Sequence, residues 1–149
     1  LVAPGVDAGQ VERFRSPLLK AGAVVRLVGP RIGPLEAAGR EVLEADCSLE
    51  NEPAVVFDAM VIPGGTAHVE TLMKDGRATE FLKDQYRHCK PIAVLGEAVG
   101  LAEGAGVLRD DADSGLFLQG EGESSVVAKF IEAVAAHRHF AREKDPPLV

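Results

Sequence analysis

One stretch, Lys90-Pro-Ile-Ala-Val-Leu-Gly-Glu-Ala-Val-Gly-Leu101, predicts a buried strand, a sharp turn and the start of a helix. Pro91 opens the strand, where its missing N–H breaks no central ladder bond. Ile92 to Leu95 form the continuous apolar run that is typical of a parallel strand covered on both faces, so this strand is central. In open α/β sheets the reacting group lies just beyond the carboxyl end of such a strand. Here the turn holds Gly96 and carries no Ser, Cys or Thr nucleophile.

The start of the chain predicts a β-α-β unit. Leu1-Val2-Ala3 is interpreted as the last half of a strand, and the chain as a piece cut from a longer protein. Asp7 caps a helix in which Val11, Phe14, Leu18 and Leu19 recur at helical spacing until Ala21-Gly22, and Ala23 to Val28 is a parallel strand. Short turns between these elements favour one domain over residues 1–149, with an α/β, flavodoxin-like fold: a doubly wound, mostly parallel sheet with helices on both faces.

The middle of the chain predicts a hairpin, a third strand and two helices. The segments Leu35 to Ala38 and Glu41 to Ala45 flank the hairpin turn, and Ser48 to Pro53 is a polar loop. Ala59 to Ile62 forms the third parallel strand. Thr66 caps a helix whose apolar residues are Val69, Leu72 and Met73, and a second helix runs from about Ala78 to Cys89 with Phe81, Leu82 and Tyr86 inward.

The last third predicts shorter elements and one long helix. A short helix passes through Val99, Leu101 and Ala102, Val107-Leu108 begins a strand, and Leu116 to Leu118 is the last strand. Arg109 to Ser114 and Gly120 to Glu123 are connections. A helix from Ser125 to about Arg142, capped by Ser124 or Ser125, carries an apolar stripe.

Charge and composition exclude several classes of protein. The net charge of −7 and pI near 5.1 argue against a nucleic-acid partner, because that affinity depends on clustered Lys and Arg. No apolar run approaches the roughly 20 residues that span a bilayer, so no membrane partner is expected. Cys47 and Cys89 fit no metal or disulfide pattern and favour a reducing compartment. We therefore expect a soluble, cytoplasmic protein.

The glycine pair Gly64-Gly65, between a strand and a helix, has two interpretations. Its backbone N–H groups can hold an anion or an oxyanion, or the pair can simply make a tight turn. The spacing of a nucleotide-binding loop is absent. His137 and His139 stand at i and i+2 on the predicted helix, about 200° apart, which disfavours a shared metal and favours a solvated or partner-facing helix end. No metal site is predicted.

Other polar residues provide no recognised catalytic group. His68 and His88 have no evident carboxylate or serine partner, and Cys89 is expected to be a buried thiol without a reactive role. Asp7 and Glu12 can approach the turn at Gly96, because the exits of the first and central strands share one sheet edge. With Gln10 and Gly96 they form no recognised dyad, so we predict no catalytic residue.

The run Phe57-Asp-Ala-Met-Val-Ile-Pro-Gly-Gly65, the turn at Gly96 and the order of elements resemble the class I glutamine amidotransferase-like superfamily, which includes intracellular proteases and deglycases. In that group the turn carries a cysteine followed by a histidine, and an acidic residue near the first turn supports the cysteine. This chain has Gly96, Glu97 and Gln10 at those degenerate positions. The resemblance implies the fold without the chemistry.

A closer resemblance covers nearly the whole chain, to the C-terminal domain of large-subunit (clade 2) haem catalases. The segments that carry it are Gly5-Val-Asp-Ala8, Val28-Gly-Pro-Arg-Ile-Gly33, Ala45-Asp-Cys-Ser-Leu49, Phe57-Asp58 through Pro63-Gly-Gly65, His88-Cys-Lys90, Leu95-Gly-Glu97 and Ala136-His-Arg-His-Phe-Ala-Arg-Glu143. In that family the haem and the decomposition of hydrogen peroxide belong to an upstream domain with a proximal tyrosine. Tyr86, the only tyrosine here, lies on an unrelated helix.

The resemblance implies a non-catalytic domain, without a cofactor of its own, whose partners are the haem domain and sister subunits of a catalase. It would stabilise the subunit or tetramer. ATP-independent chaperone (holdase) activity on unfolded client proteins is a further expectation, since superfamily relatives include holdases. The alternative is a divergent cysteine hydrolase or deglycase, which the identity of residue 96 opposes.

Overall fold

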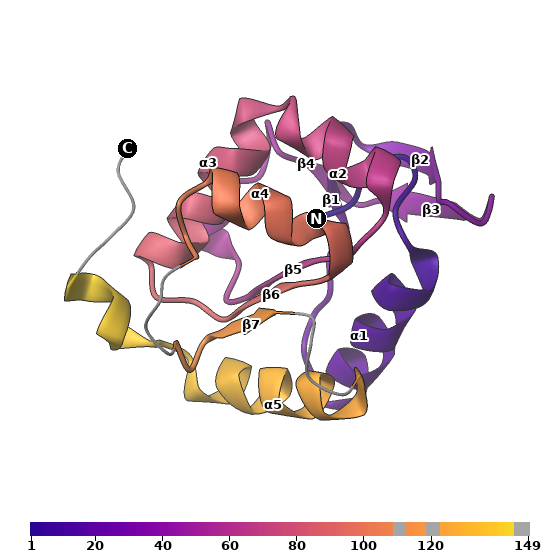
Figure 1. The fold of residues 1–149 in the computed structure, drawn as a ribbon. Helices are drawn as coiled ribbons and strands as arrows, with labels where there is room; N and C mark the ends of the chain where they lie inside the picture. The colour runs from indigo at the N-terminus through magenta and orange to yellow at the C-terminus, as the bar shows by residue number, and fades with distance from the viewer. Residues whose placement is uncertain (109–112, 119–122, 145–149) are drawn as a thin grey trace.

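Parallel strands form the middle layer of the molecule, with helices on both sides (Figure 1). The computed structural model describes residues 1–108, 113–118 and 123–144. One pair of parallel strands joins β1 to β4, and a second parallel sheet has the order β5-β6-β7. The bounds are β1 Val28–Gly29, β4 Cys47–Ser48, β5 Met60–Ile62, β6 Ile92–Val94 and β7 Leu116–Leu118. The predicted α/β fold with a doubly wound, mostly parallel sheet is confirmed.

The first residues of the chain connect these two sheets. The backbone nitrogen of Val2 donates to Val28 O at 2.9 Å, and that of Leu1 donates to Val61 O at 2.5 Å. Leu1–Ala3 therefore lies extended between β1 and β5, where the sequence predicts a strand, although no strand is assigned to it. The spatial order of extended segments is β4, β1, residues 1–3, β5, β6, β7.

Helices cover each face of this layer. On one face lie α1 (Ala8–Lys20) and α5 (Glu123–Ala136), and on the other lie α2 (Thr66–Met73), α3 (Gly76–Arg87) and α4 (Val99–Gly104) (Figure 1). None of the helices in the described ranges is long and apolar enough to cross a membrane. This arrangement of helices matches the prediction from the sequence.

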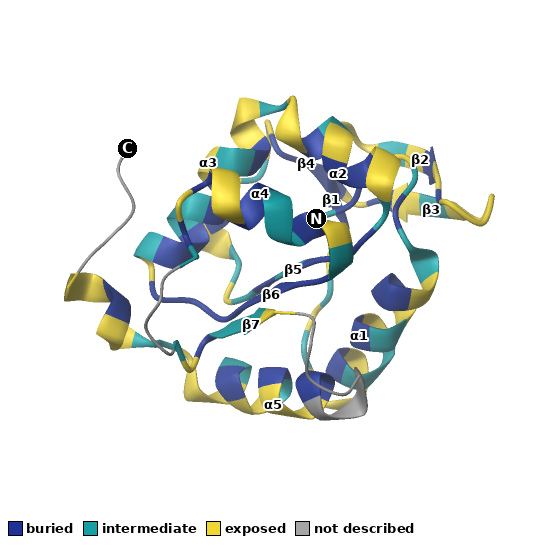
Figure 2. Ribbon diagram, viewed as in Figure 1, coloured by how far each residue is buried: buried dark blue, intermediate teal, exposed yellow. Residues whose placement is uncertain are grey.

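The central strand β6 is buried on both faces, as the apolar run predicts (Figure 2). Ile92 and Val94 pack in the cluster shared with α2, α3 and α4, whereas Ala93 packs in the cluster shared with α1 and α5. Successive side chains of a strand point to opposite faces, so one short strand joins both halves of the core.

The helix predictions are right in position and wrong at several ends. Asp7 caps α1, since its Oδ1 accepts from Gln10 N at 3.0 Å, but Leu19 is 49% exposed because it lies off the buried stripe. At α2 the cap residue is Gly65 and Thr66 is the first helical residue, while Met73 at the last turn is 55% exposed. The third helix begins at Gly76, earlier than predicted, because Asp75 accepts from Arg77 N and caps it.

The last helix is shorter than predicted. It begins at Glu123, before both serines expected to cap it, and ends at Ala136, because His137 adopts a positive φ of 72°. A separate 3-10 helix, η3 (Phe140–Lys144), then runs back toward α3. The prediction of a helix extending to Arg142 is therefore wrong.

The strand predictions fail where neighbouring strands are incomplete. From the predicted strand Ala23 to Val28 only Val28 is paired, in β1, because Leu1–Ala3 reaches no further along it. Ser48, the first residue of the predicted loop, instead belongs to β4 with Cys47 and pairs with β1. Val107-Leu108 is not a strand, since Val107 N donates to Ala102 O and extends the end of α4. Residues 109–112 and 120–122 of the two predicted connections lie outside the described residues.

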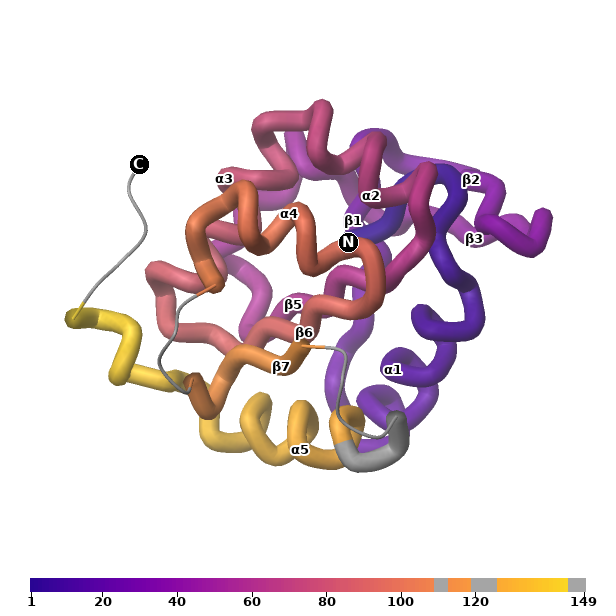
Figure 3. The backbone as a smooth tube through the Cα atoms, in the orientation of Figure 1, coloured from indigo at the N-terminus to yellow at the C-terminus, as the bar shows by residue number. Residues whose placement is uncertain are grey.

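The predicted hairpin is present and projects from one end of the molecule (Figure 3). Its strands β2 (Gly33–Glu36) and β3 (Val42–Ala45) are antiparallel, with Leu35 opposite Leu43. Arg40 has a φ of 66° in the turn. The hairpin places Gly39 and Glu41 near the carboxyl ends of the parallel strands, beside the site described next.

Candidate functional site

The carboxyl ends of the parallel strands surround a cavity of about 540 Å³. Its lining comes from the start of α1, the hairpin turn, the start of α2 and the turn after β6. The lining residues are Asp7, Ala8, Gly9, Gln10, Ala38, Gly39, Glu41, Gly65, Thr66, Gly96 and Glu97. This is the edge at which open α/β sheets bind ligands. The lining includes Gln10, Gly96 and Glu97, the degenerate positions of the predicted turn, together with Gly65 of the glycine pair.

The turn after β6 has the conformation of a nucleophile elbow without its side chain. Leu95 is extended, Gly96 has a φ of 54°, and the backbone then enters η2 (Gly96–Ala98) and α4. A positive φ at the point where a strand becomes a helix is the strained geometry that exposes a nucleophile in hydrolases. With glycine at this position the turn has no group that can attack a carbonyl carbon.

The two glycine N–H groups after β5 donate to side chains of the same chain. Gly64 N donates to Gln10 Oε1 at 2.7 Å, and Gly65 N donates to Glu97 Oε2 at 3.0 Å. The Gly65 hydrogen bond lowers the pKa of Glu97. The turn that is a candidate for binding an anion thus holds the carboxylate of Glu97, and Gln10 satisfies the buried amide beside it.

This pair of glycines leaves no room for larger residues. A Cβ on Gly65, whose φ is 123°, would lie 2.3 Å from Gly5 O, and one on Gly64 would lie 2.8 Å from Glu97 Oε2. The pair therefore makes a tight turn that only glycine fits. Its Gly65 N–H also binds a negatively charged oxygen, which Glu97 of the same chain supplies.

The two acidic residues expected near this turn, Asp7 and Glu12, lie in different places. Asp7 lines the cavity, and its Oδ1 is committed to the cap of α1. Glu12 lies on the exposed surface of the same helix and is not part of the lining. Asp7, Glu41 and Glu97 make the cavity acidic, which disfavours an anionic substrate.

The histidines and cysteines lie apart from this cavity. His68 is fully buried, and burial lowers its pKa to about 4. Burial raises the pKa of both Cys47 and Cys89, so both thiols are poor nucleophiles near neutral pH. His88 is exposed at the end of α3. In the described ranges no group of three or more His, Cys, Asp or Glu side chains can hold a metal ion.

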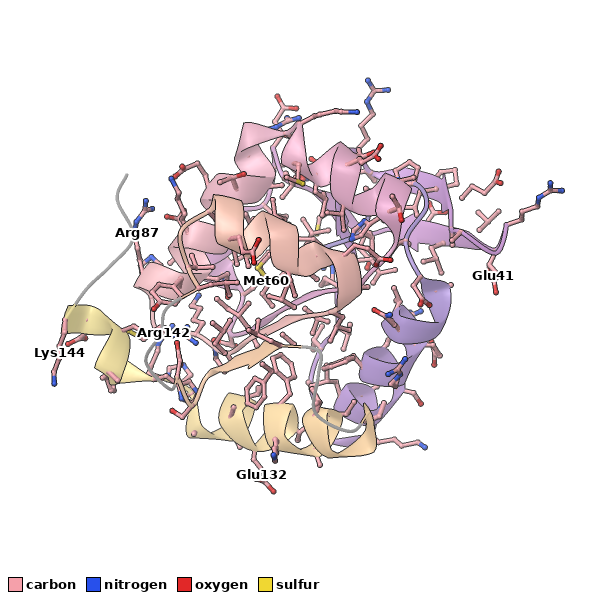
Figure 4. The ribbon with its side chains drawn as sticks, in the orientation of Figure 1. Glu41, Met60, Arg87, Glu132, Arg142 and Lys144 are labelled. Carbon is pink, nitrogen blue, oxygen red and sulfur yellow. The ribbon has the colours of Figure 1, made fainter. Side chains whose placement is uncertain are left out.

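His137 and His139 form separate contacts at the end of α5. His137 Nε2 lies 3.7 Å from Asp58 Oδ1, and His139 Nδ1 lies 2.9 Å from Ser114 Oγ. The sequence predicts a solvated or partner-facing helix end here, and Arg142, labelled in Figure 4, is instead buried.

A buried polar cluster at the opposite, amino edge of the sheet is missed by the sequence analysis. Arg142 donates to Asp113 Oδ2 through Nε at 2.5 Å and to Lys90 O through Nη1 at 2.5 Å, and its guanidinium lies 4.6 Å from the centre of the Tyr86 ring. The only signal in the sequence is a lysine placed directly before a fully apolar strand, Lys90 before Pro91.

Lys90 is itself fully buried and is held by backbone oxygens. Its Nζ donates to Val55 O at 2.8 Å and to Phe57 O, within and after η1 (Ala54–Val56). Gln85 Nε2 donates to Ala54 O at 2.5 Å. Burial lowers the pKa of Lys90, and the positive charge of Arg138 lowers it further. These contacts tie η1 to α3 and β6, which is a structural role far from the carboxyl edge.

Comparison with known families and proteins identifies relatives over nearly the full length. Residues 2–144 match the family described as the C-terminal domain found in long catalases. Catalase HPII of Pseudomonas putida is 35% identical over 143 residues, which cover 96% of this chain and 19% of that protein. Catalase-B of Dictyostelium discoideum is 30% identical over 144 residues, covering 96% of this chain and 20% of that protein. The chain thus spans about a fifth of the length of these relatives.

Solved structures with the same fold are more distant in sequence. Oxidized DJ-1 of Toxoplasma gondii has a TM-score of 0.74 at 16% identity, covering 96% of this chain and 91% of that one. A ThiJ/PfpI domain protein of Brachyspira murdochii has a TM-score of 0.78 at 16% identity, covering 89% and 92%. At this identity the likeness concerns the fold, which is the one predicted.

Proposed function

The chain belongs to the family of C-terminal domains found in long catalases, and from this membership we propose that it stabilises the subunit or tetramer of a large haem catalase without taking part in the chemistry. The family match over residues 2–144 is the observation that carries the proposal. The peroxide-decomposing activity, the haem and the sister subunits belong to the proposed parent protein.

The side chains at the candidate site support a role without catalysis. The turn at Gly96 offers no nucleophile, and the nearby amides of Gly64 and Gly65 are bonded to Gln10 and Glu97. A divergent cysteine hydrolase or deglycase would need an activated thiol here. Both cysteines are buried elsewhere, with raised pKa values.

The described residues also do not fit a haem. The cavity of about 540 Å³ at the carboxyl edge, and an apolar cavity of about 620 Å³ between residues 23–28 and 58–61, have no histidine, cysteine or tyrosine in their lining. These residues and methionine are the usual axial ligands of haem iron. Met60 contacts the apolar cavity but lies in the core cluster, and Tyr86 is buried beneath Arg142. The haem of the proposed parent is therefore assigned to its other domain.

The experiment compares the parent catalase with a version that ends before residue 1. We expect similar kcat/KM for hydrogen peroxide at low temperature and faster thermal inactivation of the truncated enzyme, with earlier loss of the tetramer. Activity decay and size-exclusion chromatography measure both. Equal inactivation rates and equal tetramer stability would contradict the proposal.

Holdase activity is a second candidate, favoured by large apolar side chains on the surface. These include Val24 at 86%, Val42 at 70%, Phe140 at 63% and Ile32 at 60% exposure. Exposed apolar surface binds other exposed apolar surface, and the net charge of −7 would keep such complexes soluble.

Light scattering from a heat-stressed client enzyme tests the holdase candidate, without ATP and with serum albumin as the control. We expect the chain at several-fold molar excess to suppress aggregation more than albumin does. Protection no better than that of albumin, together with no binding of an apolar dye, would leave only the architectural role.

A further inference from the structure

The cavity at the carboxyl edge carries charge of one sign without a counter-charge. Its ionisable lining residues are Asp7, Glu41 and Glu97, and among the described residues no lysine, arginine or histidine lines it. None of the three carboxylates forms a salt bridge with a described residue. The hydrogen bond from Gly65 N lowers the pKa of Glu97, so this carboxylate is charged at neutral pH. The cavity therefore attracts a cation.

Gln10 provides a second, independent observation. Its side chain lines the cavity and the residue is only 9% exposed. Oε1 accepts from Gly64 N at 2.7 Å, which identifies Nε2 as the other end of the amide. Nε2 donates no hydrogen bond to any described residue, and it is not among the buried atoms that lack a partner, so it keeps accessible surface on the cavity. An oxygen atom bound in the cavity would satisfy this donor.

The start of α1 adds further donors. Ala8 and Gly9 line the cavity and belong to the first turn of this 13-residue helix. The N–H groups of a first turn have no partner within the helix and point out of its amino end. The cavity thus combines carboxylates with uncharged N–H donors, so a ligand needs both a cationic group and an acceptor oxygen.

The two kinds of group lie next to one another. A Cβ built on Gly64 would stand 2.8 Å from Glu97 Oε2 and 3.3 Å from Gln10 Nε2. The carboxylate oxygen and the unpaired amide nitrogen therefore flank one small space. The whole cavity, at about 540 Å³, has the volume of a site for a small molecule.

We propose that this cavity binds a small primary ammonium compound that also carries a carbonyl oxygen. The ammonium group lies toward the carboxylates of Glu41 and Glu97, and the carbonyl oxygen accepts from Gln10 Nε2. Asp7 adds negative charge, while its Oδ1 caps α1. The turn at Gly96 has no nucleophile, so the compound is bound without being converted. This binding goes beyond the proposed function and does not depend on it.

The test is an NMR titration of the chain, which contains its own core and both helical layers. The probe is 3-amino-N,N-dimethylpropanamide, whose ammonium donates and whose carbonyl only accepts. We expect saturable shifts at the amides of Gly9, Gly65 and Glu97, with a Kd of about 1 mM. The amides of Gly22 and Gly106, beyond the far ends of α1 and α4, should not shift.

Two related compounds separate the contributions of charge and acceptor. N,N-dimethylpropanamide lacks the ammonium group and should bind at least about tenfold more weakly than the probe. Butylamine lacks the carbonyl oxygen and should bind about fivefold more weakly. Equal affinity for the probe and for N,N-dimethylpropanamide would overturn the role of the carboxylates.

Substitutions of the carboxylates test where the ammonium group binds. Glu41→Gln and Glu97→Gln should each raise the Kd of the probe about fivefold, and Glu97→Gln keeps an oxygen for Gly65 N. Glu44→Gln is the matched control, because Glu44 is exposed on the same hairpin and does not line the cavity. It should leave the Kd unchanged.

Gln10→Glu tests the amide donor. The variant keeps an acceptor for Gly64 N and loses Nε2, and thermal unfolding checks that it folds. At pH 8 the added charge strengthens the binding of the probe and of butylamine alike, so the ratio of their affinities reports the donor. We expect this ratio to fall from about five to about one.

The absence of saturable shifts at the cavity amides up to about 10 mM probe would overturn the site. The same holds if Glu41→Gln and Glu97→Gln bind the probe as well as Glu44→Gln does. These titrations do not involve the parent catalase, so their failure leaves the proposed role in its stability untouched.

Discussion

At the scale of single residues, the main difference from the sequence analysis is the number of buried polar side chains. Gln10, His68, Gln85, Lys90 and Arg142 are all buried. Gln10, Gln85, Lys90 and Arg142 bond to backbone groups distant in sequence, such as Gly64 N for Gln10 and Val55 O for Lys90, whereas the ring nitrogens of His68 have no hydrogen-bond partner among the described residues. A buried polar group is costly without a partner, so the hydrogen bonds of the other four residues fix the local conformation around them.

His68 should make stability depend on pH. Its pKa is lowered to about 4 by burial, below the 6.5 of an exposed histidine, so the unfolded chain binds more protons between these values. The free energy of unfolding should therefore fall as pH drops from about 6.5 to about 4, by roughly 3 kcal/mol from this residue.

Urea denaturation of the chain and of His68→Leu at several pH values measures this contribution. The variant should lose less stability over the interval than the unaltered chain does. Parallel losses in the two proteins would show that His68 is not the group responsible.

At the scale of elements, the segment after α5 forms a buried latch across the amino edge of the sheet. His139 N donates to Cys89 O at 2.7 Å, and Arg142 of η3 contacts Asp113, Lys90 O and the ring of Tyr86. The Arg142 side chain is 2% exposed and that of Asp113 is 13% exposed, so this ion pair is largely removed from water. Figure 4 shows Arg142 between η3 and the body of the molecule.

Arg142→Ala should destabilise the chain by roughly 3 kcal/mol, because it leaves Asp113 buried without its cation. Amides of residues 139–144 should exchange faster than in the unaltered chain. Arg138→Ala is the matched control, since Arg138 donates an exposed hydrogen bond to His88 O, and this substitution should cost about 1 kcal/mol or less. Similar losses from both substitutions would refute a special role for the buried pair.

Sequence patterns predict the elements whose structure depends on nearby residues. The cap at Asp7, the hairpin around Arg40 and the apolar run of β6 follow from local propensity and periodicity. The end of α5 and the absence of a strand at residues 23–27 depend on residues far away in the sequence. The spacing of apolar residues does not reveal such contacts. Topology predicts the carboxyl edge as the place of a site, whereas the hydrogen bond from Gly65 to Glu97 joins two turns that are 32 residues apart and follows from no local pattern.

At the scale of the whole molecule, the two edges of the sheet differ in character. The carboxyl edge holds an acidic cavity near Gly96, and the amino edge holds the buried cations of Lys90 and Arg142. Between them lies the apolar cavity of about 620 Å³ beside β5. Among the described residues, no cavity brings a nucleophile and a general base together.

The chain alone should neither turn over hydrogen peroxide nor hold haem. After incubation with haem and gel filtration we expect no Soret band, because the cavities offer no histidine, cysteine or tyrosine ligand. Esterase and peptidase assays should give background rates. A Soret band that co-elutes with the chain, or turnover that disappears in Cys89→Ser, would contradict this prediction.

The bonds that Gln10 and Glu97 make at the carboxyl edge also constrain how this sequence can vary. Each amide in the turn after β5 needs an acceptor, and positions 10 and 97 supply one each. In related sequences that keep this turn, residues 10 and 97 should remain hydrogen-bond acceptors, even where the residue types differ. A relative with an apolar residue at position 97 would need a compensating acceptor elsewhere, so the requirements of folding limit sequence variation at this edge.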